Sequence, residues 1–147
     1  MHGQPSQVYE LIIGSNEDVR RCIDEYIVAR GWEHVYISGA IGSLCEVTFS
    51  APVTATLPPE VALTQFVGAA EVTSFLGYTY KRSLAPPDEL KLDPQNDSPL
   101  YVHIHISCGI TGAHSLAGGF RGGKTLRAMN IYMIPVTSHD PDMNYEH

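Results

Sequence analysis

The sequence contains few cysteines, and no two of them are spaced as in a metal-binding or disulfide motif. Its three cysteines, Cys22, Cys45 and Cys108, include no Cys-x-x-Cys pair. This argues against a disulfide framework and against a cysteine-rich zinc site, and it fits a reducing compartment. Cys108 directly follows a histidine-bearing segment. It is therefore either a buried structural thiol or a further soft metal ligand.

Long apolar runs are also missing. The first residues lack the basic segment and apolar stretch of a secretory signal, and no run approaches the roughly 18 apolar residues that cross a bilayer. We therefore expect a cytoplasmic protein with no membrane partner.

Basic residues are outnumbered by acidic ones. The formal net charge is −7, and the nine lysines and arginines are scattered along the sequence. An acidic chain is repelled by the phosphate backbone of nucleic acids unless its basic residues gather on one surface. The composition therefore disfavours sequence-independent DNA binding unless folding or assembly clusters these residues.

The length of 147 residues is that of a single domain. We expect its core to span about 8–136, followed by a polar, frayed tail at 137–147. One helix is predicted after a short first strand at 8–13, with Ser15 or Asn16 as its N-cap and Gly31 just beyond its end. The prediction depends on an apolar stripe of helical spacing: Val19, Cys22, Ile23, Tyr26 and Ile27.

Strand patterns dominate the rest of the chain. Residues 35–50 read as two strands broken by Gly39 and Gly42, 64–82 as one or two strands, and 125–136 as the last. A proline-bearing loop separates the first two groups, and the segment 83–99 with four prolines reads as a surface loop or lid. One helix and six or seven strands indicate an α+β fold on a largely antiparallel sheet. So little helix leaves apolar sheet surface uncovered, which predicts an oligomer.

A histidine cluster in YVHIHISCGITGAH is the strongest functional signal. Side chains two apart on a strand share a face, so His103 and His105 should stand together. The opposite, apolar face would be formed by Val102, Ile104 and Ile106. If the following turn returns His114 over the histidine face, three imidazoles would form a metal site with an open position, most simply for zinc. The alternative is a polar face or an oligomer interface.

The glycine-rich stretch 109–123 permits two interpretations. Its backbone N–H groups would cradle an anion, with Arg121 and Lys124 adding positive charge, or it is simply a hairpin turn. It is not a P-loop, because the glycine spacing is wrong and Lys124-Thr125 leads into a strand.

A family resemblance is carried by three segments in this order: YELIIGSNEDVRRCIDEYIVARGWEHVYISGAIGSLCEVTFS, AAEVTSFLGYT and YVHIHISCGITGAH. Together they resemble the plant- and prokaryote-conserved (PPC) domain, whose bacterial members are also catalogued as PD1-like DNA-binding proteins. The resemblance covers about Tyr9 to Val136, and the His-x-His pair with its glycine-histidine turn is its most specific part. It implies a homotrimer of α/β domains, with histidine strands near the subunit boundaries and zinc bound in some prokaryotic members.

Carried over by position, the family's paired histidines fall on His103 and His105, its turn histidine on His114 and its acidic residue on Glu71. The family turn Gly-Gly-His-Leu reads Gly112-Ala113-His114-Ser115 here. The plant members' AT-hook arm for the minor groove has no counterpart in this sequence.

Two functions follow from these residues. The first is a trimeric domain with a three-histidine zinc or other divalent metal site that binds or transforms a small, anionic metabolite. Arg121 or Lys124 would hold its carboxylate, and Glu71 would either act as general acid and base or order a histidine. The alternative is a DNA-binding or transcription-regulatory protein of the PD1-like class.

Overall fold

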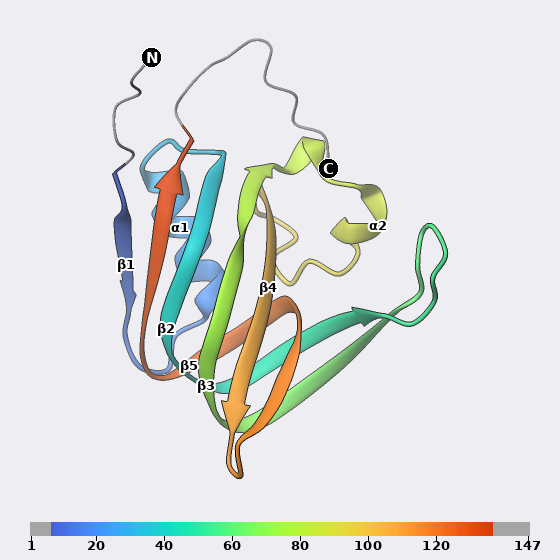
Figure 1. The fold of residues 1–147 in the computed structure, drawn as a ribbon. Coiled ribbons are helices and arrows are strands. Elements are labelled where there is room, and N and C mark those ends of the chain that lie inside the picture. Colours follow the sequence, from blue (N-terminus) through green and yellow to red (C-terminus); the bar gives the residue numbers. More distant parts are fainter. Residues whose placement is uncertain (1–6, 137–147) are drawn as a thin grey trace, which may run out of the picture.

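A computed structural model describes residues 7–136 (Figure 1). Its elements follow in the order β1 (Tyr9–Ile13), α1 (Val19–Ala29), β2 (Val35–Pro52), β3 (Val61–Lys81), the short 3-10 helix η1 (Arg82–Leu84), α2 (Pro87–Leu90), β4 (Leu100–Ile110) and β5 (His114–Pro135). All pairings between these strands are antiparallel. The expected α+β fold, with a largely antiparallel sheet and one main helix, is confirmed. The polar tail expected at 137–147 lies outside the described residues.

The sheet closes on itself at one end. Its strand order is β1-β5-β2-β3-β4, and the beginning of β5 pairs with β4 as well. Gly119 on β5 therefore lies between His105 of β4 and Ser50 of β2. Beyond this point the end of β2 and the start of β3 continue as a projecting two-stranded hairpin (Figure 1). The closure leaves a hollow between β4, β5 and the base of this hairpin.

The helix α1 covers one face of the sheet. Val19, Ile23 and Ile27 are fully buried, which confirms the predicted apolar stripe. The N-cap is Asp18, whose carboxylate accepts a hydrogen bond from the Arg21 backbone N–H at 3.0 Å. The prediction of Ser15 or Asn16 at this position was wrong, because the chain turns before the helix begins. No helix of the described residues is long and apolar enough to cross a membrane.

The predicted strand breaks at glycine were also wrong. Residues 35–52 form one strand, because Gly42 lets β5 approach closely: a Cβ there would lie 2.6 Å from the Ala128 carbonyl oxygen. A Cβ on Gly118 would lie 2.6 Å from the Ser50 carbonyl oxygen. Most of the glycine-rich stretch thus belongs to β5 and its ladder. Its glycines are therefore strand residues, and the anion-binding role that the sequence allows for this stretch stays a prediction.

In the described part of the chain, the face of the sheet opposite α1 carries exposed side chains. Tyr36, Tyr78 and His103 lie side by side across β2, β3 and β4 on this face. Two apolar side chains here, Ile12 and Ile41, are 67% and 71% exposed. The histidines therefore border an uncovered and partly apolar surface.

Candidate functional site

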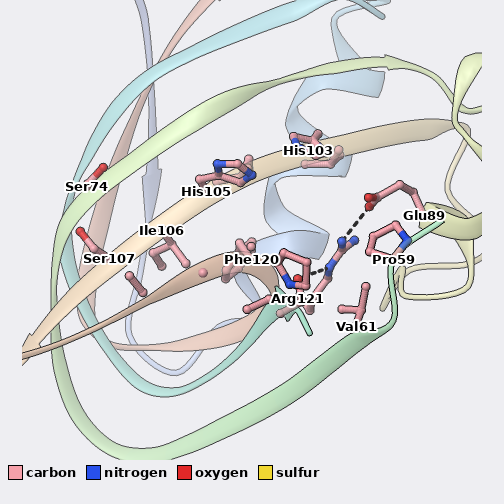
Figure 2. Close-up of a pocket in the computed structure, with 18 residues that line it drawn as sticks. Pro59, Val61, Ser74, Glu89, His103, His105, Ile106, Ser107, Phe120 and Arg121 are labelled. Carbon is pink, nitrogen blue, oxygen red and sulfur yellow. Dashed lines mark hydrogen bonds and ion pairs between the residues drawn. The ribbon is translucent and has the colours of Figure 1, made fainter. Parts of the chain in front are cut away.

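A cavity of about 510 Å³ lies at the closed end of the sheet (Figure 2). It is bounded by β4, the beginning of β5, the base of the β2–β3 hairpin and the short helix α2. Four side chains capable of ionisation or proton exchange line it: Glu89, His103, His105 and Arg121. Its apolar walls include Pro52, Pro59, Val61 and Phe120.

The cavity is lined by consecutive residues of β4, the histidines His103 and His105 and the residues that alternate with them, Val102, Ile104 and Ile106. Ile104 and Ile106 are buried, whereas His103 is half-buried and His105 is exposed. The two imidazole rings are 5.1 Å apart between centroids. The predicted placement of His103 and His105 on one face is therefore what the structure has, and both open into the same cavity.

His103 is held in place by two aromatic neighbours. The hydroxyl of Tyr101 lies 2.7 Å from Nδ1 of His103, and the ring of Tyr78 stacks on the imidazole at a centroid distance of 5.3 Å. Burial raises the pKa of Tyr101, and the nearby Glu89 carboxylate raises it further, so its hydroxyl stays protonated at neutral pH. The contact with Tyr101 therefore fixes the orientation of the His103 ring at the cavity.

Arg121 is the cation of the cavity. Its Nε donates to the Ser50 hydroxyl at 2.9 Å, and its Nη2 donates to Oε2 of Glu89 at 2.7 Å. The Arg121 side chain is only 12% exposed and that of Glu89 is 26% exposed. A guanidinium in this partly desolvated position requires an anionic partner, which Glu89 supplies in this structure.

His114 is not brought to the other two histidines within one chain. It begins β5 opposite Ile110, at the tip of the β4–β5 hairpin, whereas Gly119 is the residue opposite His105. Five residues of strand separate these two levels, or about 16 Å. The sequence left open whether the turn returns His114 over the histidine face. It does not, because an antiparallel hairpin with a short turn places each residue of β5 beside its own partner on β4. The residue of β5 beside His105 is instead Gly119.

Glu71 and Lys124 also lie away from the histidines. Glu71 is exposed and pairs with Gly109, five residues along β3 from the partner of His105. Lys124 pairs with Glu46 and lines a separate cavity of about 190 Å³. Of the residues proposed from sequence, His103, His105 and Arg121 therefore share a cavity, and Glu71, Lys124 and His114 lie outside it.

Three residues of the site were missed by the sequence analysis. Tyr101 carried a usable signal, because it lies two residues before His103 on the same strand face. Ser50 and Glu89 carried none. They reach Arg121 from sequence separations of 71 and 32 residues, and only the closure of the sheet and the path of the segment before β4 bring them together.

The sequence matches the family model of the Plants and Prokaryotes Conserved domain over residues 1–137. The chain belongs to this family. The resemblance in the sequence is thereby confirmed, and we refer to the protein as a PPC domain. None of the curated proteins matches it.

Solved structures share the fold of this PPC domain at low sequence identity. A PPC protein of Pyrococcus horikoshii aligns with a TM-score of 0.71 and 17% identity, over 91% of this chain and 81% of the other. A metal-containing protein of Archaeoglobus fulgidus aligns with a TM-score of 0.72 and 18% identity, over 95% and 88%. A candidate DNA-binding protein of Bacteroides thetaiotaomicron aligns with a TM-score of 0.69 and 15% identity, over 93% and 83%. At these identities the comparison establishes the fold alone.

Proposed function

We propose that this PPC domain binds a small anionic metabolite in the cavity of His103, His105 and Arg121. The observation that carries the proposal is the meeting of an almost buried arginine and two imidazoles in one space of about 510 Å³. Hydrogen bonds to a charged group contribute more in a partly desolvated site than at the surface. The histidines add donors or acceptors beside that charge, and His103 supplies a position at which a proton can be given or taken.

Isothermal titration calorimetry with benzoate and with inorganic phosphate tests the proposal. The variant Arg121→Gln should lose roughly 10- to 100-fold in affinity, since it removes a charge-assisted hydrogen bond. Arg127→Gln is the matched control, because Arg127 is an exposed arginine on the same strand. Equal affinity of Arg121→Gln and wild type, or no binding of either anion at millimolar concentration, would show that this cavity is not an anion site.

The described residues of a single chain do not form a metal centre by themselves. No group of three or more histidine, cysteine, aspartate or glutamate side chains within residues 7–136 is arranged to hold a metal ion. His103 and His105 supply two ligands, and zinc sites of this kind use at least three protein ligands. We propose that His114 completes such a set only from a neighbouring copy. Metal analysis of untagged protein supplied with zinc tests this, because His114→Ala should then lose metal as fully as His105→Ala. Retention of zinc by His114→Ala would contradict it.

We further propose that the protein is a homotrimer. The sheet face opposite α1 supports assembly, because Ile12, Ile41 and Tyr36 are exposed on it and directly continue the histidine face. Exposed apolar patches of this kind mark interaction surfaces. Native mass spectrometry should give three times the chain mass, and a monodisperse monomer at micromolar concentration would refute the proposal.

DNA binding is the second candidate function, since solved neighbours include candidate DNA-binding proteins. The charges of this chain count against it. Of its nine basic residues, Arg20, Arg82 and Arg121 are committed to internal ion pairs. A DNA-binding surface needs lysines and arginines that face the phosphates. Sub-micromolar, salt-sensitive binding to a duplex at physiological ionic strength would establish this function over the first.

A further inference from the structure

We infer that the metabolite is a carboxylic acid whose carboxylate takes the place of Glu89 on Arg121, so that Glu89 is a built-in competitor for the site. This inference rests on the proposed anion site and specifies its ligand class and its regulation. The ion pair of Arg121 and Glu89 is already a carboxylate bound to the cation of the cavity, at 2.7 Å.

The two partners of this ion pair are not held equally. Arg121 lies on β5, is 12% exposed and is also fixed by the Ser50 hydroxyl. Glu89 lies on the four-residue helix α2 and is 26% exposed. A carboxylate that enters the cavity would therefore leave the arginine in place and release Glu89 toward solvent.

Release of Glu89 does not require the rest of its segment to detach. Four residues later, Asp93 is buried between two arginines: it pairs with Arg20 of α1, and its Oδ2 accepts from Arg82 at 2.8 Å. These ion pairs hold the segment in place at Asp93. The Glu89 side chain can therefore move away from Arg121 while Asp93 keeps its contacts. The displacement involves one side chain and at most the short helix that carries it.

The cavity favours a carboxylate over a phosphate. Among residues 7–136, its lining contains a single lysine or arginine, namely Arg121. A guanidinium can bind either anion in a side-by-side geometry, so the charge decides: one cation balances the single negative charge of a carboxylate. A phosphate would bring up to two charges to this one cation. The apolar walls at Pro52, Pro59 and Val61 favour a carboxylic acid with an apolar body.

The variant Glu89→Gln tests the competition. It keeps the size of the side chain and removes the internal carboxylate, so more of the protein is competent to bind. We expect benzoate to bind it roughly 10- to 100-fold more tightly than wild type, because the competing bond is a charge-assisted one. The matched control is Asp88→Asn, which removes the same charge from an exposed position on the same helix and should leave the affinity unchanged. Acetate should bind more weakly than benzoate, and phosphate more weakly still.

The outcomes separate the two claims. If wild type binds benzoate through Arg121 but Glu89→Gln binds it no better, the anion site stands and the competitor role of Glu89 is wrong. If Asp88→Asn gains as much as Glu89→Gln, the gain is a general charge effect and the competitor role is again wrong. Binding of phosphate as tight as that of benzoate would overturn the ligand class. If no anion binds wild type at millimolar concentration, the proposed function fails together with this inference.

Discussion

The buried ion pairs around Asp93 give the sharpest stability prediction. The Asp93 carboxylate lies between Arg20 and Arg82 and is 5% exposed, while the Arg20 side chain is 4% exposed. Removing one partner of such a pair costs about 3–5 kcal/mol, because the remaining charge stays buried without compensation. Arg20 keeps its second partner, Asp24, at 2.9 Å. We therefore expect Asp93→Asn to lower the free energy of unfolding by the smaller of these values, about 3 kcal/mol.

The assay is urea unfolding at fixed protein concentration, followed by circular dichroism. For a domain of this size the loss corresponds to a melting temperature about 6–12 °C lower. The control is Glu25→Gln, whose partner Arg21 lies 3.9 Å away with exposed fractions of 59% and 72%. A surface pair of this kind contributes under about 1 kcal/mol. If Asp93→Asn and Glu25→Gln unfold at the same urea concentration, the buried pairs do not hold the segment as argued.

Three further predictions follow from single contacts. Gly77→Ala should destabilise the fold by about 1–3 kcal/mol, since its Cβ would lie 2.0 Å from the His103 carbonyl oxygen. Gly109→Ala is the control: its Cβ meets only a methyl group at 3.7 Å, so this variant should melt at the temperature of wild type. Burial raises the pKa of Cys108 from 9.0 to about 11, so the folded protein should resist iodoacetamide there at pH 8. The Cys108 thiol ionises at a lower pH in the unfolded chain than in the folded protein. The free energy of unfolding should therefore fall as the pH rises from 9.0 to about 11, and Cys108→Ala should lose this pH dependence. Tyr101→Phe should shift the Nδ1 resonance of His103 in nitrogen NMR; an unchanged resonance would refute their hydrogen bond.

Local features of the fold were predictable from the sequence, whereas contacts between distant strands were not. The helix α1 followed from an apolar stripe and the glycine after its end, and Gly31 indeed has a φ of 70°. The β4 alternation followed from a period of two. Gly39 and Gly42 of β2 were interpreted as strand breaks, and the glycines of β5 as an anion cradle or a hairpin turn. Gly42 and Gly118 instead let a distant strand approach closely. That role becomes visible only when the partner strand is in place.

The candidate site divides in the same way. His103 and His105 were placed together by the geometry of a single strand. The position of His114 could not be decided, because the sequence does not reveal the length of the hairpin turn or the register that follows it. The Arg121–Glu89 pair joins β5 to α2, and no sequence period connects them. The sequence pattern of a single strand therefore predicted which side chains share a face. Contacts that depend on the closure of the sheet could not be predicted from it.

The binding of a carboxylate to Arg121 in place of Glu89 is tested most directly by a crystal structure of the wild-type protein soaked with benzoate. We expect benzoate to occupy the cavity, with its carboxylate within hydrogen-bonding distance of the Arg121 guanidinium and its ring against Pro59 and Val61. A structure at saturating benzoate in which the ion pair of Arg121 and Glu89 is intact and the cavity holds no benzoate would contradict it.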